Sequence, residues 1–528
     1  DYTLIRKPQK EATKAASLKE EQEKIAAETP EISTASVIAV GDNLYHSKLY
    51  ESGEYDSGTW NYDHIYTHIL DQVQAADVAM IDQETVFAPS HDAVSSYPSF
   101  ATPEEVGDAI IKAGFNVVES ATNHADDYGY DYLKNTLDFW STNYPDIPVL
   151  GIHSTQEDAD TVKVKEVNGI KIAFLDYTYG TNNSGVGDGY EYMLDIFDKD
   201  KITTMIQKAK EVSDCIIFVA HWGTEDETMP NEYEKQWAAF LMQQGVDVII
   251  GGHPHVLQPY GQLSDDQGHT TTVFYSLGNF VSTQQELPEL LEGMASFTIQ
   301  KSTLNGKSTI QILAPTVKPM VMHYDYDSGE YGPYMLDDYT EELASSHSVR
   351  NVIGDEFTLD NLKAKFKEIM SMNVKPSTNT NLLNVKFDWE GNMIDKTTGN
   401  VVEDTESIHS WEYLADTAGG SVVVRIAQIP LTPQIILTVQ IAQTVTATTA
   451  TTVVTTVVTT VVMTMAVMIA VTIAVTTVVI TMAAMIAATM KAIDYLYAKR
   501  TMLCIVLFTY HAIFINLTVS PHSVWSLQ

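Results

Sequence analysis

Five short apolar runs in this chain each end at polar residues of the kinds that bind metal ions. Runs of this length and composition predict buried β-strands. Ligands of open α/β sheets bind beyond the carboxyl ends of the strands. The runs and the segments that follow them are Ser36–Val40 before Gly41–His46, Asp77–Ile81 before Asp82–Glu84, Asn116–Ser120 before Ala121–His124, Cys215–Ala220 before His221–Glu225, and Val246–Ile250 before Gly251–His255. The sequence therefore predicts an α/β fold in which distant parts of the chain assemble one site.

The residue types at these strand ends suit a transition metal. Imidazole together with carboxylate favours Zn, Mn, Fe or Ni, whereas all-oxygen ligand sets suit Mg and Ca. A carboxylate can bridge two ions about 3.5–4 Å apart, which is the spacing of two-metal hydrolytic sites. His253 and His255 flank Pro254, whose ring fixes its own backbone torsion, and Gly251 and Gly252 permit a turn close to the ions. The prediction rests on the ordered set of five motifs, because each motif alone is a weak signal.

The stretch from Ser36 to Asn279 resembles the CapA proteins of capsule and poly-γ-glutamate synthesis, which are similar in fold to the calcineurin-type metallophosphatases. The matching motifs occur in the family's order. They are Gly41–His46, Asp82–Thr85, Tyr97–Phe100, Ala121–Gly129, His221–Glu225, Gly251–Val256 and Tyr275–Phe280. The resemblance implies a four-layered α/β/β/α sandwich of the metallophosphatase type, with a metal site at one edge.

The resemblance also implies roles for individual side chains. Glu84 would be a bridging carboxylate. His124 would be no ligand but a general acid beside the site, oriented by Asp127. Apart from the resemblance, we expect Asp82 and Glu225 to stand behind the ligands, where a carboxylate can orient a ligand histidine. Glu225 lies four residues after His221, and a solvated loop acid is its alternative role. The implied metal ligands are Asp42, His46, Glu84, Asn123, His221, His253 and His255.

The chain departs from the family pattern at three places. Asp82 stands where many members have Asn, and Gly252 stands where they often have a further His. His46 lies further from Asp42 than in the metallophosphatase motif. These departures make the first metal position the weaker one, so we expect one or two divalent ions, with Mn, Zn or Fe favoured.

Charge limits the partners. The net charge is −38, and the tail from Ile426 onward contributes +2, which leaves −40 on residues 1–425. Nucleic-acid binding needs a basic footprint, so we expect no nucleic-acid partner. The same charge disfavours direct capture of a polyanion such as poly-γ-glutamate, unless metal ions or local Lys residues offset the field.

Composition divides the chain into four parts. Residues 1–35 are a charged linker, and because the chain begins at Asp1 we expect it to follow a missing membrane anchor. Residues 36–315 hold the metallophosphatase-like domain, and residues 316–425 form its peripheral C-terminal part, with a helix around Leu359–Met372. Residues 426–528 are a low-complexity Thr/Val/Ala/Met-rich tail, uncharged as far as residue 490, with a candidate span at Thr501–Val519; this tail is either membrane-associated or an unreliable stretch of sequence.

Local signals place several further elements. Pro103 opens a helix that carries acids in its first turn and stops at Gly114. Cys215 lies in an apolar strand and is expected in the core; two cysteines give no disulfide framework. The segment Tyr177–Asn182 follows a strand, and either lines the substrate cleft or is a polar loop with a buried Tyr.

The leading interpretation is a metal-dependent hydrolase anchored at the extracellular face of a bacterial membrane. It would act on capsule or poly-γ-glutamate polymer, or within its synthesis complex. Metal-bound water would attack a phosphoester or amide, and His124 would protonate the leaving group. Two alternatives remain open: a non-catalytic scaffold of a membrane polymer-synthesis complex, and a generic metallophosphoesterase such as a nucleotidase.

Overall fold

The structure is a computed structural model. It describes residues 29–402 except 56, 57, 184, 185 and 388–391, with residues 14, 16, 17 and 19 before them. In the tail the structure describes an antiparallel pair of short strands, β16 (Ile435–Leu437) and β17 (Val461–Met463). Residues 1–407 form one compact unit and residues 408–528 another. Most of the predicted linker and tail, including Thr501–Val519, lies outside the described residues. Within the part that the structure describes, no helix has both the length and the apolar character needed to cross a bilayer.

The first sheet contains seven strands in the order β13-β12-β11-β1-β2-β3, with β10 also paired to β1. Its parallel strands β1, β2 and β3 end at or just before predicted site motifs, and β10, parallel to β1, begins at Asn279 of a further motif. All five residues of β2 are buried, as expected for a strand covered on both faces. The bounds are β1 (Glu31–Asn43), β2 (Val78–Asp82), β3 (Val117–Glu119), β10 (Asn279–Val281), β11 (Leu291–Leu304), β12 (Lys307–Asp325) and β13 (Glu330–Met335).

The second sheet contains six strands in the order β4-β5-β6-β7-β9-β8. The four central strands are parallel, and β4 and β8 pair with them antiparallel at the two edges. In register, Thr178 of β5 faces His221 of β6, and His221 faces Gly252 of β7. The bounds are β4 (Lys163–Val167), β5 (Ile170–Thr178), β6 (Cys215–His221), β7 (Val248–Gly252), β8 (Tyr260–Ser264) and β9 (Thr270–Phe274).

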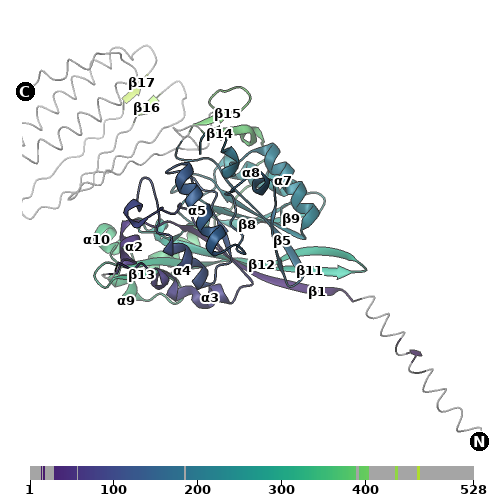
Figure 1. Ribbon diagram of the computed structural model, residues 1–528, viewed down its shortest axis with the longest axis horizontal. Helices are drawn as coiled ribbons and strands as arrows, with labels where there is room; N and C mark the ends of the chain where they lie inside the picture. Colours follow the sequence, from purple (N-terminus) through teal and green to yellow (C-terminus); the bar gives the residue numbers. More distant parts are fainter. Residues whose placement is uncertain are drawn as a thin grey trace, which may run out of the picture. The chain divides into compact units, whose positions relative to one another are not determined.

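Helices accompany both sheets (Figure 1). The predicted helix after Pro103 begins at Glu105 and ends where Gly114 takes a left-handed φ of 115°. Helix α8 begins with a capping box, in which Asn231 and Glu234 each bond the other's backbone N–H. The α-helices are α2 (Ser47–Ser52), α3 (Leu70–Gln74), α4 (Glu105–Ala113), α5 (Tyr130–Asn143), α6 (Gln156–Ala159), α7 (Lys199–Val212), α8 (Glu232–Gln243), α9 (Glu341–Ser346), α10 (Arg350–Ile353) and α11 (Leu359–Met370). The 3₁₀ helices are η1 (Asp63–Ile69), η2 (His91–Ala93), η3 (Glu191–Met193), η4 (Pro288–Leu290), η5 (Gly354–Glu356) and η6 (Asn381–Asn384).

Two large hydrophobic clusters hold the unit together. The first joins buried side chains of β1, β2 and β11 to those of β5, β6 and β7, so it packs the two sheets on each other. The second joins the other side of the second sheet to α7 and α8. Cys215 is buried in the first cluster as a free thiol, as the sequence predicted. This packing fixes the carboxyl ends of strands from both sheets, and the architecture is mixed α/β.

The segment after residue 315 belongs to the same compact unit as the residues before it. Strand β12 runs across that position, and β13 extends the first sheet at its edge. The helix predicted around Leu359–Met372 is α11. Figure 1 shows β1, β11 and β12 extending side by side. Their pairing agrees with this, since Glu31 of β1 pairs with Thr303 of β11, and Leu304 of β11 pairs with Lys307 of β12.

Candidate metal centre

Strand ends from both sheets supply the candidate site. Asp42 of β1 and Asp82 of β2 are register partners in the first sheet. His221 ends β6, and His253 and His255 follow β7 in the second sheet. All five side chains are buried, with exposed fractions of 0–4%. The sequence expectation that distant motifs meet at one edge is therefore met in the structure.

The carboxylate of Glu84 lies at the centre of three imidazoles. Its Oε1 is 3.8 Å from Nε2 of His221, 3.9 Å from Nε2 of His255 and 4.0 Å from Nε2 of His124. These separations are too long for hydrogen bonds. Neither carboxylate oxygen has a hydrogen-bond partner within the described part of the chain. Burial raises the pKa of Glu84 to about 7, because the ionised form is desolvated there.

Asp42 and His255 form the first half of the centre. Oδ2 of Asp42 lies 3.0 Å from Nδ1 of His255, and Asp42 also accepts a hydrogen bond from the backbone N–H of His253. Oδ1 of Asn279, on β10, lies 3.1 Å from the same Nδ1 of His255. Ligating atoms of Asp42, Glu84 and His255 all lie within 4.8 Å of one another.

Asp82, His221 and Asn123 form the second half. Nε2 of His221 lies 2.8 Å from Oδ1 of Asn123, and its Nδ1 lies 3.3 Å from Oδ2 of Asp82. Burial lowers the pKa of His221 well below its ordinary value, so the imidazole is neutral, which is the form that binds metals. Ligating atoms of Asp42, Asp82 and His221 also lie within 4.8 Å of one another, so Asp42 belongs to both groups.

Two observations show that these residues fit divalent transition metal ions. The first is the set of buried polar atoms without a hydrogen-bond partner among the described residues, which includes Glu84 Oε1 and Oε2, Asp82 Oδ1 and His253 Nδ1. Leaving such atoms unsatisfied is costly, and a cation would satisfy them. The second is the donor set of imidazole, carboxylate and one amide oxygen, which suits Zn, Mn or Fe.

Gly252 leaves the space that the carboxylates occupy. A Cβ at this position would lie 2.6 Å from Oδ1 of Asp42 and 3.1 Å from Oδ2 of Asp82. Real Cβ atoms do not approach oxygen so closely, and both carboxylates are buried. The departure from a family histidine at this position therefore has a physical reason in this chain.

The turn after β7 holds both histidines in unusual backbone conformations. His253 has φ of 95° and His255 has φ of 58°. Non-glycine residues in such regions cost of order 1–3 kcal/mol each, and they cluster at functional sites. The ring of His253 lies 5.0 Å from that of His221 and 4.6 Å from that of Tyr179, between centroids.

His124 is oriented by Asp127. Nδ1 of His124 lies 2.6 Å from Oδ2 of Asp127, and that oxygen also accepts the backbone N–H of Phe100. Burial opposes protonation of His124, but the Asp127 carboxylate outweighs it and raises the pKa of His124 above its ordinary value. With Nδ1–H donated to Asp127, Nε2 is the nitrogen that faces Glu84.

His46 and Glu225 stand apart from these contacts. His46 belongs to neither of the two groups of three among the described residues; its ring packs on Phe100, and its Nδ1 accepts the backbone N–H of Thr283 at 3.4 Å. Burial lowers the pKa of His46 to about 3. Glu225 is exposed on the loop after β6, where its charge acts on Glu84 and His255.

The sequence reasoning missed two asparagines. Asn279 sits in the matched motif Tyr275–Phe280, so the signal was present but its contact with His255 was not foreseen. Asn182 follows β5, at the end of the segment Tyr177–Asn182, and contacts both Asn123 and His124. The same segment places Tyr177 in the core and Tyr179 against His253. It therefore supplies both a buried Tyr and side chains beside the centre.

Further carboxylates lie beneath the ligands. Glu119 of β3 is the register partner of Asp82, and burial raises the pKa of Glu119 well above its ordinary value. Asp176 of β5 accepts the backbone N–H groups of Ser120 and Ala121, and burial raises its pKa to about 7. Burial thus disfavours negative charge on these acids, and a nearby cation would favour their ionised forms.

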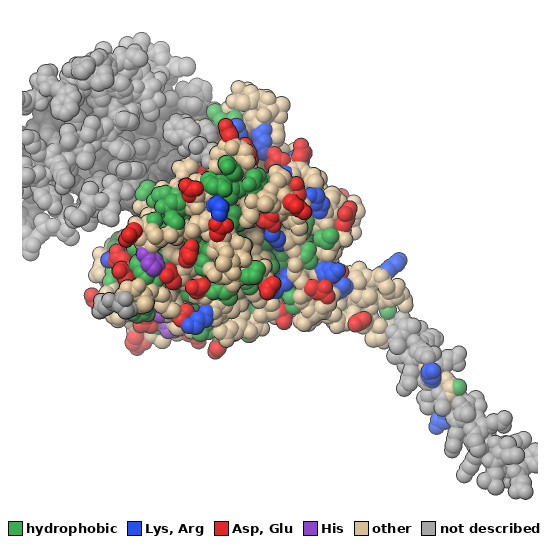
Figure 2. All heavy atoms as spheres, viewed as in Figure 1, with side chains coloured by type: hydrophobic (Ala, Val, Ile, Leu, Met, Phe, Trp, Pro, Cys, Tyr) green, Lys and Arg blue, Asp and Glu red, His purple; other side chains and the backbone are tan. Residues whose placement is uncertain are grey.

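The loops at this edge contain no Lys or Arg. The loop sequences are residues 43–47, 83–104, 120–132, 179–194, 222–231, 253–259 and 279–290. They carry acids such as Asp126, Asp188 and Glu225 instead. On the face drawn in Figure 2, acidic side chains are likewise spread over the domain. The condition that local Lys residues offset the negative field is therefore not met by these loops.

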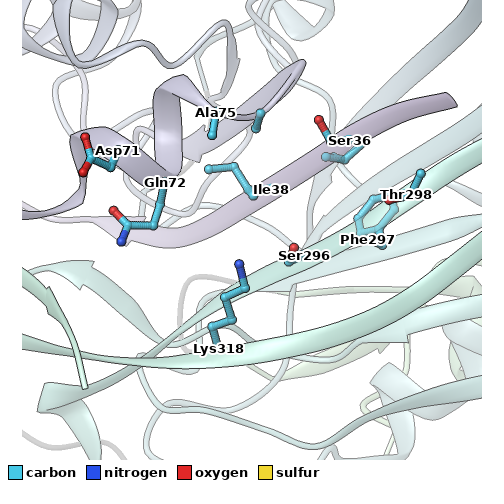
Figure 3. Close-up of a pocket in the computed structure, with 11 residues that line it drawn as sticks. Ser36, Ile38, Asp71, Gln72, Ala75, Ser296, Phe297, Thr298 and Lys318 are labelled. Atoms are coloured by element: carbon cyan, nitrogen blue, oxygen red, sulfur yellow. The ribbon is translucent and has the colours of Figure 1, made fainter. Parts of the chain in front are cut away.

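A separate surface pocket of about 380 Å³ lies between α3 and the strands β1, β11 and β12. Lys318 reaches from β12 toward the side chains of Gln72 and Ser296 there (Figure 3). None of the candidate metal ligands lines this pocket.

Comparison with known proteins places the candidate centre in a family. Residues 36–284 match the family model described as "Bacterial capsule synthesis protein PGA_cap". A curated relative, the PGA biosynthesis protein CapA of Bacillus subtilis (strain 168), is 29% identical over 268 residues, or 49% of this chain and 67% of that protein. The capsule biosynthesis protein CapA of Bacillus anthracis is 31% identical over 185 residues, or 34% of this chain and 43% of that protein, so the match spans less than half of that relative.

A solved structure, the Thermus thermophilus sulfate thiohydrolase SoxB in complex with glycerol, is similar at 12% identity and a TM-score of 0.27, over 48% of this chain and 42% of SoxB. A likeness this low supports no argument about function. The family model covers the segment that contains every candidate ligand, from Asp42 to His255. Through this segment, the chain belongs to the CapA family of bacterial capsule synthesis proteins.

Proposed function

We propose that this protein is a metal-dependent hydrolase that acts on a capsule polymer, of which poly-γ-glutamate is one candidate. The observation that carries the proposal is the position of Glu84 Oε1, which is 3.8–4.0 Å from Nε2 of three histidines and has no hydrogen-bond partner within the described part of the chain. The names of the two relatives support the link to capsule and PGA biosynthesis.

In this proposal, one set of residues binds the metal ions and another transfers a proton. Asp42, Glu84, His255, Asp82, His221, Asn123 and His253 would hold one or two ions. When bound, such ions lower the pKa of water to near neutrality and polarise the scissile group. Asp127 keeps the imidazole of His124 in one tautomer by accepting its Nδ1 proton. Nε2 of His124 then delivers a proton to the leaving oxygen or nitrogen, which is general acid catalysis.

Finer features belong to the same proposal. The two packed sheets and their helices would form the four-layered sandwich of the metallophosphatases, supported by the two hydrophobic clusters. The protein would work at the extracellular face of a bacterial membrane, held by an anchor and in company with a polymer-synthesis complex. The composition of residues 1–35 motivates the anchor, and the PGA and capsule names of the relatives motivate the location.

The test begins with metal content. We expect near-stoichiometric Mn, Zn or Fe by elemental analysis of the purified full chain, and its loss in the double variant His253→Ala/His255→Ala. The matched control is His68→Ala/His91→Ala, two histidines that form ion pairs with Glu330 and Glu105 on partly exposed surfaces.

A substrate screen follows on the metal-loaded protein, with generic phosphoesters and γ-glutamyl peptides. Turnover that disappears with the double variant supports the hydrolase. Metal that is retained in the double variant would refute the site. Bound metal with persistent inactivity on both substrate classes would favour the scaffold alternative.

A further inference from the structure

Asn182 joins two parts of the candidate centre that the sequence separates by more than fifty residues. It lies just after β5, and its backbone N–H donates to the carbonyl oxygen of Asn123 at 3.1 Å. Its side chain is exposed at the edge of the centre. This backbone bond places the Asn182 carboxamide beside the side chains of Asn123 and His124.

The side chain of Asn182 sets the direction of the Asn123 carboxamide. Nδ2 of Asn123 donates to Oδ1 of Asn182 at 3.2 Å, while Oδ1 of Asn123 lies 2.8 Å from Nε2 of His221. A carboxamide binds a metal through its oxygen, because its nitrogen carries two protons and is only a donor. Which end faces a site is decided by the hydrogen bonds of the other end.

The other end of Asn182 rests on the proposed acid. Its Nδ2 lies 3.2 Å from Nδ1 and 3.5 Å from Nε2 of His124. Because Nδ1 carries the proton given to Asp127, this is a packing contact against the ring and not a hydrogen bond. A single exposed side chain therefore contacts one candidate ligand and the candidate proton donor at once.

We propose that Asn182 is a positioning residue of the metal centre. It keeps the oxygen of Asn123 turned toward His221 and restrains the ring of His124. The inference rests on the proposed metal-binding function, because orientation of the Asn123 oxygen matters only if that oxygen binds an ion.

The neighbouring Asn183 provides a matched control. Its Nδ2 donates to the backbone carbonyls of Asp126 and Asp127 at 2.9 and 3.0 Å, so it fastens the same two loops together. Among the described residues, it makes no hydrogen bond with the side chains of Asn123 or His124. If the segment acted only as a strap, loss of either asparagine would have the same effect.

The experiment measures Mn²⁺ and Co²⁺ binding to the metal-free full chain by calorimetry. Removing a group that orients a metal ligand typically weakens metal binding by about 10–100-fold, and we expect a loss in this range for Asn182→Ala. Asn182→Asp keeps an acceptor for Nδ2 of Asn123 and should stay within a few-fold of wild type. Asn183→Ala should bind as wild type does.

The visible spectrum of the Co²⁺ protein gives a readout independent of turnover. We expect the spectrum to change in Asn182→Ala and to be restored in Asn182→Asp, because the ligand oxygen is lost and regained. Thermal unfolding of the metal-free variants checks folding, and Asn182→Ser is the second truncation if Asn182→Ala does not fold.

The outcomes separate the two proposals. Wild-type protein that binds neither ion overturns the proposed function, and the role of Asn182 with it. Wild-type protein that binds metal while Asn182→Ala binds equally well, with an unchanged Co²⁺ spectrum, overturns only the role of Asn182. Equal losses in Asn183→Ala and Asn182→Ala also overturn it, since they point to the strap rather than to the amide.

Discussion

Gly252 and Asp42 are so close that the first has no room for a side chain. A Cβ on Gly252 would lie 2.6 Å from Oδ1 of Asp42, whose side chain is fully buried. Asp42 cannot withdraw without losing its contact with His255 at 3.0 Å. The absence of a side chain at Gly252 is thus a requirement of the carboxylate arrangement.

Gly252→Ala should therefore damage the centre more than the fold. We expect metal affinity to fall by at least 10-fold in calorimetric titration, because Asp42 is displaced from its position. Gly261→Ala on β8 is the control, since a Cβ there meets nothing within 4 Å. Equal metal binding by the two variants would show that Asp42 tolerates displacement and is not a ligand.

Asp127→Asn should separate proton transfer from metal binding. The Asp127 carboxylate is hydrogen-bonded to Nδ1 of His124. Among the described residues, it makes no hydrogen bond with a candidate metal ligand. We expect unchanged metal content and a fall of about 100-fold or more in turnover of a generic phosphoester, the usual size of a general acid contribution. The variant also removes the charge that raises the pKa of His124, so the alkaline limb of the pH–rate profile should move to lower pH.

The control for that variant is Asp131→Asn, an exposed acid in the first turn of α5 with the same change of charge. It should leave both turnover and the pH profile in place. Loss of metal in Asp127→Asn would contradict the assignment, because His124 and Asp127 would then hold the ion rather than the proton.

The cation-free loops predict weak capture of anionic polymer. Metal-free protein should show no measurable binding of poly-γ-glutamate at low salt, where the Debye length exceeds about 10 Å and like charges repel most strongly. Glu225→Lys should create binding that fades as salt is added. Glu211→Lys, at the C-terminal end of α7 and so at the opposite edge of the sheet, is the control. Strong binding by unmodified metal-free protein would show that another surface captures the polymer.

His347 predicts acid sensitivity away from the metal centre. Its Nε2 donates to the carbonyl of Met322 at 3.0 Å, and its Nδ1 accepts the backbone N–H of Val349 at 3.0 Å. The neutral ring is thus satisfied at both nitrogens, and a proton on Nδ1 would face another N–H. Burial lowers the pKa of His347 to about 3.

The sign follows from linkage. The pKa of a histidine in the unfolded chain is about 6.5, and the pKa of His347 in the folded protein is lower. Between these two pH values, the unfolded chain binds a proton that the folded protein does not. Stability is therefore present above that range and is lost as pH falls through it. We expect the free energy of unfolding of His347→Gln, measured by urea titration, to depend less steeply on pH than that of wild type, by up to about 1.4 kcal/mol per pH unit between about pH 6.5 and pH 5. Parallel curves for the two proteins would contradict the prediction.

The sequence located the strands well because their signal is local. An uninterrupted apolar run followed by polar residues marked the ends of β2 at Asp82 and β6 at His221. The helix between Glu105 and Gly114 was equally predictable from the sequence, because it ends at a glycine with positive φ. The side chains that meet at Glu84 followed from these strand ends together with the family resemblance.

The features of the site that could not be predicted from the sequence depend on contacts between loops. Nothing in the sequence around Asn182 shows that it lies against Asn123, because that contact depends on how the loop after β5 returns over the first sheet. His46 lies near the strand-end motif yet turns toward Phe100 and Thr283, a choice made by packing. The antiparallel pair β11 and β12 was also not predicted, because polar residues such as Gln300 and Gln311 interrupt its apolar pattern.

The placement of the ligands at strand ends has an evolutionary consequence. Asp42, Asp82 and His221 lie in strands and His253 directly follows β7, whereas the tyrosines and acids around them belong to connecting loops. Loops tolerate insertion and substitution far better than buried strands do. Descendants of such a chain can therefore exchange one polymer for another by rebuilding their loops, while inheriting the reaction centre unchanged.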